Sequence, residues 1–275
     1  PTDRPFFLWV ATLAPHEDLC PTCDDEPTPA PRHEGAFGDW VPSEIPLSFN
    51  EDDVSDKPDY IRTLDKLTKA DGVALLRKER KRLESLLAVD DLVARVVNAV
   101  AARGELDNTV FLFTSDNGYA LGEHRNDVYF KKVPYEESIR VPLYVRGPGF
   151  PAGGAETRLV SNHDLAGAVA ALAGASPGLV LDGGDIQTVS SDRAVYLYNS
   201  GQKGPPAYDG VRTSRWVYLN YETGEKELYD LQADPFQLES RHADPAYADV
   251  QTALHDALKA LRLCAGPTCD VTVAP

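Results

Sequence analysis

Acidic, amide and basic side chains follow an apolar run near the middle of the chain. Residues 110–113 are β-branched and aromatic, and Asp116 and Asn117 come shortly after them. Carboxylate and amide oxygens suit a hard cation, and Lys131 and Lys132 add compact positive charge downstream. This combination predicts a pocket that holds a cation together with an anionic ester. The alternative is an Asx turn that caps a strand, with both lysines on a solvated loop.

The net charge of the chain limits its partners. It is −16 at pH 7, and nucleic acids and anionic membranes need a basic surface, so we expect neither as a partner. An anionic ester would therefore need a local positive pocket, for which Arg125, Lys131, Lys132 and Arg140 are the candidates. The sequence also has no apolar run of about 18 residues and no signal-peptide pattern in its first ten residues. It leaves the oligomeric state open.

The elements that must position these residues are short strands alternating with helices. Strands are predicted at residues 5–13, 110–113 and 141–145, and helices at 70–103 and 165–173. His16 follows the first strand and Asp116 the second, and ligands bind at the carboxyl ends of strands in open α/β sheets. Residues 17–59 show neither the helical nor the strand spacing of apolar residues, and we therefore predict a long loop there. The alternation predicts a layered α/β domain.

The pattern changes beyond about residue 194. Short alternating segments at residues 195–198, 216–221 and 226–229 predict an antiparallel sheet, with a turn at 222–225. A last helix at about 245–263 would cover one face of that sheet. We therefore predict an α/β domain over residues 1–193 and a smaller α+β subdomain over residues 194–275.

The four cysteines form two close pairs in the sequence. Cys20 is close to Cys23 in the sequence, and Cys264 is close to Cys269. This spacing favours local disulfides formed in an oxidising compartment. A thioredoxin-like motif should open a helix, but Cys23 runs into an acidic, proline-rich segment. A zinc ribbon would need matched spacings, which the two pairs lack.

Several linked motifs resemble one enzyme family. They are TSDNGY at residues 114–119, LGEH at 121–124, Lys131 four residues before YEE at 135–137, IRVP at 139–142 and RGPG at 146–149. Together they resemble the C-terminal half of the sulfatase catalytic domain. Residues 6–16, 86–93, 104–109 and 264–269 are similar to N-acetylglucosamine-6-sulfatases and related arylsulfatases within that family. The resemblance covers nearly the whole chain in the family's order.

The resemblance implies an alkaline-phosphatase-like α/β fold with a mainly parallel sheet, followed by the α+β subdomain. It also implies one calcium ion held partly by Asp116 and Asn117. Lys131 and His16 would be catalytic residues that contact the sulfate, and His124 and Lys132 are further substrate-binding candidates. The expected partner is a sulfated carbohydrate or an aryl sulfate, in a secreted, lysosomal or periplasmic setting.

The departures from the family pattern concern the nucleophile. The family uses a formylglycine made from the cysteine of a C-x-P-S-R type motif, and no cysteine here has proline two residues later and arginine four residues later. The acidic pair that completes the family's calcium site is also absent. We therefore expect the nucleophile and the remaining calcium ligands in an N-terminal half outside this chain, and we expect the chain alone to be inactive.

Two other functions compete with a sulfatase. A phosphomonoester or phosphonate hydrolase of the same superfamily would use a similar metal and lysine. A non-catalytic remnant would keep the fold and bind anionic glycans through Lys131, Lys132, Arg125 and His16. A C-x-P-x-R cysteine upstream would support the sulfatase, whereas a threonine or serine nucleophile would support the phosphate chemistry.

Overall fold

The computed structural model describes residues 4–18, 26–202 and 204–273. Cys20 and Cys23, for which a disulfide is predicted, lie outside these residues. The chain divides into two compact units, each made of separate segments. The first contains Pro1–Ile45, Leu67–Leu112 and Val145–Phe150, and the second contains Pro46–Lys66, Phe113–Tyr144 and Pro151–Pro275. Residues on both sides of the predicted boundary at 193 belong to the second unit, and that boundary stays a prediction.

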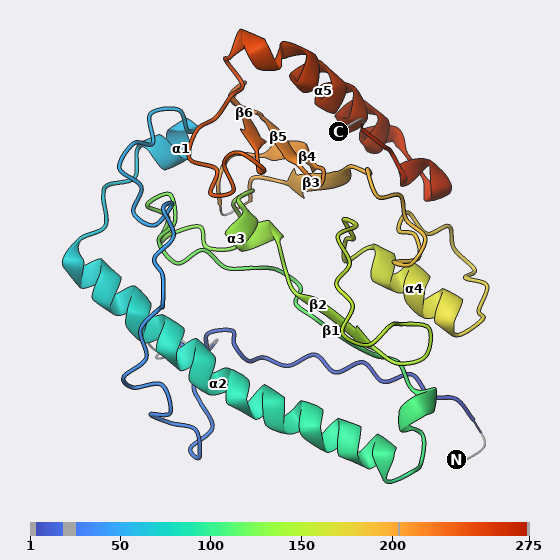
Figure 1. Ribbon diagram of the computed structural model, residues 1–275. Helices are drawn as coiled ribbons and strands as arrows, with labels where there is room; N and C mark the ends of the chain where they lie inside the picture. The colour runs from blue at the N-terminus through green and yellow to red at the C-terminus, as the bar shows by residue number, and fades with distance from the viewer. Residues whose placement is uncertain (1–3, 19–25, 203, 274–275) are drawn as a thin grey trace. The chain divides into compact units, whose positions relative to one another are not determined.

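The first unit contains the long helix α2 (Lys69–Ala101), drawn in cyan and green in Figure 1. It confirms the helix predicted over residues 70–103. Thr68 and Asp71 form a capping box in which each side chain accepts a hydrogen bond from the other residue's backbone N–H. Gly104, with φ of +69°, follows the C-terminal end, where the left-handed conformation favours glycine. The short 3₁₀ helix η1 (Leu106–Asn108) comes next.

The strand predicted over residues 5–13 is wrong for the described part of the chain. No described strand pairs with this segment, and its large apolar side chains are exposed, with Phe7 at 71% and Trp9 at 81%. An apolar run becomes a strand only when a neighbour completes its hydrogen-bond ladder. The long irregular segment predicted after it is confirmed in its described part, up to α1 (Asp59–Arg62).

Two other predicted strands are confirmed with shifted ends. They are β1 (Phe111–Thr114) and β2 (Leu143–Arg146), which pair in a two-stranded sheet. They are less buried than their sequences predict, since Phe113 is 43% exposed and Tyr144 is 68% exposed. The four-residue helix α3 (Glu136–Ile139) precedes β2 in the chain.

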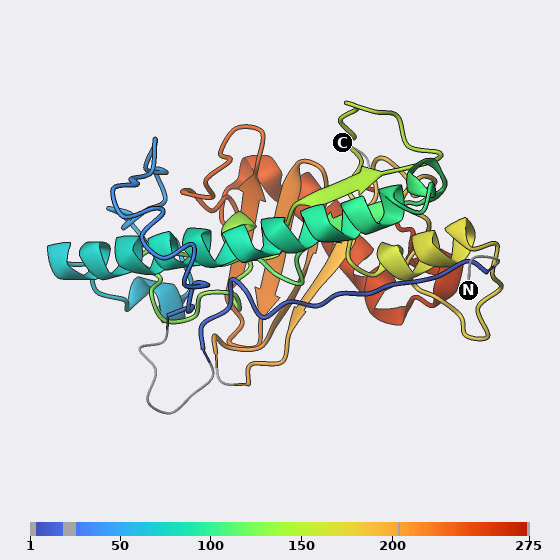
Figure 2. The ribbon, with the colours of Figure 1, turned by 90° about the horizontal axis from the view of Figure 1, so that it is seen from below.

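The second unit contains a four-stranded antiparallel sheet whose strands follow the chain in spatial order. The strands are β3 (Val195–Asn199), β4 (Tyr208–Arg212), β5 (Trp216–Tyr221) and β6 (Lys226–Asp230). Three of them and the turn at residues 222–225 were predicted, whereas β4 was not. We call this sheet the C-terminal sheet. Figure 2 shows its strands side by side in orange.

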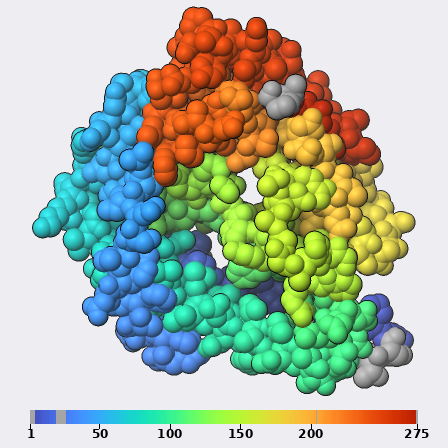
Figure 3. Space-filling view, in the orientation of Figure 1, coloured from blue at the N-terminus to red at the C-terminus, as the bar shows by residue number. Residues whose placement is uncertain are grey.

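Side chains from β5 alternate between the two faces of the C-terminal sheet. Trp216 and Tyr218 pack with helix α5 (Ala248–Leu263), which confirms that the last helix covers one face. Val217 and Leu219 belong to a second apolar cluster on the other face, which also contains Tyr135. In Figure 3 the orange atoms of the sheet and the red atoms of α5 form a continuous surface.

The remaining elements of the second unit lie before and after the C-terminal sheet. Helix α4 (Asp164–Leu172) confirms the helix predicted at 165–173, and the buried Asp164 accepts hydrogen bonds from Ser161 N, Gly184 N and Arg193. The short 3₁₀ helices η2 (Pro245–Tyr247) and η3 (Gly266–Cys269) flank α5. A disulfide joins Cys264 to Cys269, as predicted. Of the described helices, none has the length and apolar character needed to cross a membrane.

Candidate active site

The turn that follows β1 is held by hydrogen bonds from its own side chains and from Asn162. Asp116 Oδ1 accepts a bond from Asn117 N at 3.0 Å, and Asn117 Nδ2 donates to Gly118 O at 2.8 Å. Asn162 Nδ2 donates to the carbonyls of Ser115 and Asp116, at 3.0 and 3.2 Å. Because the amide nitrogen of Asn117 is engaged, its Oδ1 is the atom left to act as a ligand. Both side-chain bonds reach only the adjacent residue, whereas an Asx turn needs a bond to the backbone two residues on, so these bonds do not form the Asx turn of the alternative prediction.

Close backbone contacts join this turn to helix α3. Gly118 N donates to Ser138 O at 2.9 Å, and Tyr119 N donates to Glu137 O at 2.7 Å. A Cβ at Gly118 would lie 2.0 Å from Glu137 O, so only glycine fits there. The glycine of the TSDNGY motif is thus explained by this approach of two backbones.

Lys131 follows a residue with restricted backbone geometry. Phe130 has φ of +43° and stacks on the ring of Tyr119, with centroids 4.9 Å apart. Its carbonyl accepts hydrogen bonds from Ala120 N at 2.9 Å and from Ser138 Oγ at 2.6 Å. Ser138 therefore contacts both the turn that carries Asp116 and the residue before Lys131.

The two lysines have different surroundings. Lys131 is exposed, which suits contact with a ligand from solvent. Lys132 is half-buried, and its Nζ donates to Gln202 O at 3.3 Å. The two lysines therefore differ in exposure, and the role of Lys131 at an anion site stays a prediction.

Helix α3 is anchored by side chains of the C-terminal sheet and of the loop after it. Arg212 binds Glu136 through two hydrogen bonds, Nε to Oε1 at 3.1 Å and Nη2 to Oε2 at 2.9 Å. Gln237 Oε1 accepts a bond from Glu136 N at 2.8 Å. Tyr135, directly before the helix, donates to the buried Glu227 at 2.9 Å. The position of α3, and of the residues that it supports, is therefore fixed by the C-terminal part of the chain.

His124, a predicted substrate-binding residue, lies in the interior. Its exposure is 0%, its Nδ1 is 2.6 Å from Glu51 Oε2, and its ring centroid is 4.0 Å from that of Tyr135. Its backbone N donates to Ser48 O at 2.7 Å. These contacts tie the LGEH segment to residues 48–51, so His124 has a structural place that its sequence position did not indicate.

The two arginines suggested for a positive pocket also differ. Arg125 donates to the carbonyls of Glu51 at 2.9 Å, Asp52 at 2.7 Å and Leu64 at 3.4 Å, so its guanidinium is engaged by backbone. Arg140 keeps its side chain 77% exposed, 3.9 Å from Glu136. Of the two, Arg140 is the one with a largely exposed guanidinium.

His16 belongs to the first compact unit, whereas Asp116, Asn117, Lys131, Lys132 and His124 belong to the second. Its Nδ1 lies 2.9 Å from Glu17 O, and its backbone N donates to Leu13 O at 2.8 Å. The structure thus brings the Asp116 turn and the Lys131 segment together on α3. The place of His16 at that site stays a prediction.

Asp116 and Asn117 supply two oxygen ligands of the kind that calcium prefers. Among residues 4–18, 26–202 and 204–273, no group of three or more histidine, cysteine, aspartate or glutamate side chains is placed to hold a metal ion. The pair therefore fits a partial cation site that needs further ligands.

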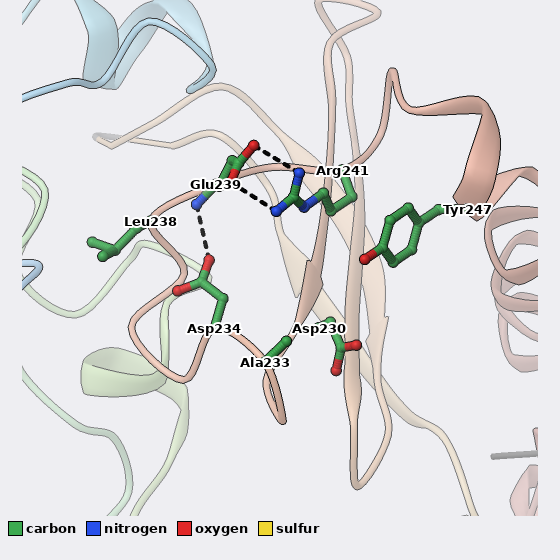
Figure 4. A pocket seen from close by; sticks show the side chains of 7 residues that line it. All are labelled: Asp230, Ala233, Asp234, Leu238, Glu239, Arg241 and Tyr247. Carbon is green, nitrogen blue, oxygen red and sulfur yellow. Dashed lines mark hydrogen bonds and ion pairs between the residues drawn. The ribbon is translucent and has the colours of Figure 1, made fainter.

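A pocket of about 250 Å³ lies in the C-terminal region. Its lining residues are Asp230, Ala233, Asp234, Leu238, Glu239, Arg241 and Tyr247, shown in Figure 4. Arg241 pairs with Glu239, and Asp234 accepts a bond from Glu239 N at 2.9 Å. Asp230 binds Arg215 through both carboxylate oxygens. Three carboxylates and one guanidinium make the lining acidic, so this pocket does not suit an anionic ester.

Sequence reasoning missed three residues that organise the site: Glu51, Ser138 and Asn162. Glu51 lies 73 positions from His124, and Asn162 lies 46 and 47 positions from the carbonyls that it binds. Such pairings cannot be read from one sequence. Ser138 stands between the YEE and IRVP motifs in the chain, and this position was the available signal.

Comparison with protein families gives two overlapping matches. Residues 1–175 match the family described as Sulfatase, and residues 122–263 match the family described as N-sulphoglucosamine sulphohydrolase, C-terminal. An arylsulfatase of Volvox carteri is 31% identical over 97% of this chain and 48% of its own length. An N-acetylglucosamine-6-sulfatase of Bos taurus is 30% identical over 97% of this chain and 53% of its own length. The chain spans about half the length of these relatives.

Solved structures share the fold. BT4656, determined in complex with its substrate D-glucosamine-2-N,6-O-disulfate, has a TM-score of 0.72 and 23% identity over 84% of this chain and 61% of that chain. A phosphonate monoester hydrolase of Agrobacterium radiobacter has a TM-score of 0.58 and 26% identity over 68% of this chain and 42% of that chain.

Proposed function

Because the chain belongs to the sulfatase family, we propose that it forms part of a sulfuric ester hydrolase acting on a sulfated sugar or an aryl sulfate. Its fold is the alkaline-phosphatase-like α/β fold. The names of the two relatives, an arylsulfatase and an N-acetylglucosamine-6-sulfatase, support these two classes of substrate. The partner would be the sulfated substrate itself.

The observation that carries the proposal is the common support of two charged segments by α3. Ser138 accepts a bond from Gly118 N and donates to Phe130 O, which places its two contacts beside the Asp116–Asn117 turn and beside Lys131. An aspartate–asparagine pair suited to a cation and an exposed lysine, held by the same short helix, suit the singly charged sulfate group of such an ester. Lys131 would stabilise negative charge on the sulfate oxygens.

Asp116 and Asn117 would hold a calcium ion in this proposal. The fit rests on one carboxylate and on an amide whose nitrogen is already engaged, which leaves oxygen for the cation. Bound there, calcium would polarise the sulfate group and favour the charge that develops in the transition state. The remaining ligands and the formylglycine nucleophile would come from other residues of the full-length protein.

The other predicted residues would act as follows. His16 would give a proton to the leaving oxygen of the substrate. Lys132 binds Gln202 O and His124 is buried, so we propose that both support the site and do not contact the sulfate. The disulfide between Cys264 and Cys269 supports maturation in an oxidising compartment, whether secreted, lysosomal or periplasmic.

The proposal is tested with the natural full-length protein and p-nitrophenyl sulfate. We expect hydrolysis of the sulfate ester, with a loss of about 100-fold or more in kcat/KM for Lys131→Ala because a charge that stabilises the transition state is removed. Lys132→Ala is the matched control and should change kcat/KM far less. A folded protein that hydrolyses no sulfate ester would contradict the proposal and favour a remnant that binds anionic glycans.

A phosphonate monoester hydrolase is the second candidate. The likeness to the Agrobacterium radiobacter enzyme supports it, and a cation with a lysine does not by itself separate sulfate from phosphonate. The same preparation should be assayed with p-nitrophenyl phenylphosphonate and p-nitrophenyl phosphate. Faster turnover of either compound than of the sulfate would favour this second candidate.

A further inference from the structure

We propose that Asn199 and Tyr208 of the C-terminal sheet are positioning residues for Lys131, because both hold the backbone carbonyl of Lys132. This inference rests on the proposed function. It adds a role for the C-terminal sheet in that function, since residues about 70 positions away in the chain would set the place of the lysine that meets the sulfate.

The backbone of Lys131 is held on both sides. The carbonyl before it, Phe130 O, accepts bonds from Ala120 N at 2.9 Å and from Ser138 Oγ at 2.6 Å. The peptide after it is held by Lys132 N, which donates to Tyr129 O at 3.0 Å, and the next carbonyl, Lys132 O, accepts bonds from Asn199 Nδ2 at 3.0 Å and from Tyr208 Oη at 3.1 Å. Phe130 O and Lys132 O therefore each use both of their lone pairs, and the short stretch of backbone between them, which contains Lys131, has little freedom to rotate.

Asn199 and Tyr208 converge on one carbonyl because of the sheet register. They are direct partners across the β3–β4 pair, at the last residue of β3 and the first residue of β4. Residues opposite one another in an antiparallel pair have neighbouring side chains. One cross-strand pair of β3 and β4 therefore supplies both hydrogen-bond donors to Lys132 O.

Both donors are themselves fixed. Asn199 Oδ1 accepts a bond from Gly201 N at 2.8 Å, which orients the amide so that Nδ2 faces Lys132 O. Tyr208 is only 7% exposed, and its ring lies 5.6 Å from that of Tyr221. Burial raises the pKa of Tyr208, so its hydroxyl stays protonated and remains a donor.

The side chain of Lys132 lies along the same part of the sheet. Its Nζ donates to Gln202 O at 3.3 Å, and a Cβ added at Gly204 would come within 2.8 Å of its Cδ. Lys132 is thereby committed to the β3–β4 connection, while the preceding side chain, Lys131, is exposed. A lysine has a long flexible stem, so a fixed backbone is the main way in which the protein can limit where its ammonium group reaches.

The test is a double-mutant cycle in the full-length protein with p-nitrophenyl sulfate. Tyr208→Phe and Asn199→Ala should each lower kcat/KM by about three- to tenfold, the effect of one lost neutral hydrogen bond. In a Lys131→Ala background the same changes should have no further effect, because they act only through Lys131. Tyr198→Phe is the matched control in the same strand, since Tyr198 is 66% exposed and its hydroxyl makes no bond to Lys132 O. Equal losses in both backgrounds would overturn the positioning role and leave the proposed function standing.

Amide hydrogen exchange gives a measurement that does not depend on activity. Lys132 N donates to Tyr129 O at 3.0 Å, and this amide should exchange several-fold faster in Tyr208→Phe and Asn199→Ala than in Tyr198→Phe. Unchanged exchange in both variants would overturn the inference even if activity fell. Absence of sulfatase activity in the folded wild-type protein would overturn the proposed function, and this inference with it.

Discussion

Removal of the Tyr135 hydroxyl tests whether the buried carboxylate of Glu227 holds the segment before α3. Glu227 has no exposed surface, and it accepts hydrogen bonds from Tyr135, Tyr221 and Tyr229. Tyr135 is itself only 1% exposed. Tyr135→Phe deletes this donor and leaves the ring in place; the Tyr135 hydroxyl also interacts with that of Tyr60, and the pH dependence separates the part of the loss that is due to Glu227.

The size of the effect follows from the charge of the acceptor. A hydrogen bond to a charged group contributes about 1.5–3 kcal/mol, and a neutral one about 0.5–1.5 kcal/mol. Burial raises the pKa of Glu227, and the tyrosine hydroxyls oppose that rise by binding the charged form. We therefore expect Tyr135→Phe to lower the free energy of unfolding by about 1.5–3 kcal/mol at a pH above the raised pKa of Glu227.

The same reasoning gives the pH dependence. A carboxyl group whose pKa is raised in the folded state favours folding below its unfolded pKa of about 4.3, and this contribution is lost as the pH rises through the folded pKa. Without Tyr135 the charged form loses a donor, so the pKa rises further and the variant loses more stability at high pH than at low pH. At about pH 4 Glu227 is protonated, and the deficit should shrink to about 0.5–1.5 kcal/mol.

Urea unfolding of wild type and variant at both pH values measures this directly. Tyr218→Phe is the matched control, since the Tyr218 hydroxyl donates to the neutral Asn220 Oδ1 at 3.0 Å. Its deficit should be about 0.5–1.5 kcal/mol at either pH. A Tyr135→Phe deficit no larger than that of Tyr218→Phe, or one that does not change with pH, would refute the reasoning.

Two further changes test the backbone contact at Gly118 and the exposed apolar segment. Gly118→Ala puts a Cβ 2.0 Å from Glu137 O and should cost about 1–3 kcal/mol and reduce sulfatase activity, whereas Gly72→Ala, in α2 with open space around it, should stabilise by about 1 kcal/mol. Thermal unfolding compares them, and equal melting temperatures would contradict the contact. Trp9→Lys should reduce binding of an apolar dye to this chain, because Trp9 is 81% exposed in the apolar segment at residues 5–13. Unchanged dye binding would contradict the prediction that this segment binds the dye.

The elements could be predicted from the sequence where a local pattern determines them. The long helix has a capping box, an apolar period and a terminal glycine, and all three are local signals. Strand β4 was missed because Asp209 and Gly210 form a dipeptide typical of turns. In the structure a Cβ at Gly210 would lie 2.2 Å from Tyr218 O, so glycine is needed there for strand packing. Only the neighbouring strand reveals that reason.

The candidate site was predictable to a different extent. The residues with chemical groups, Asp116, Asn117 and Lys131, stand in motifs, and their order in the chain was enough to predict them as site residues. Their supports were not found, because Asn162, Asn199 and Tyr208 act through hydrogen bonds to backbone carbonyls far away in the sequence. The burial of His124 depends on Glu51 in the same way. A sequence motif can identify a functional side chain, but it cannot identify the distant side chain that donates a hydrogen bond to a backbone carbonyl.

The contacts of the segment between Lys131 and α3 make the C-terminal sheet part of the site. Lys132 O is held by β3 and β4, Glu136 by Arg212 of β4, and Tyr135 by Glu227 of β6. The two family matches overlap at residues 122–175, and this overlap contains the whole anchored segment. A division of the chain at residue 193 would separate the lysine from the groups that hold it. The unit that positions the proposed sulfate site therefore extends across both family matches, and the sheet that follows the site in sequence supports it in space.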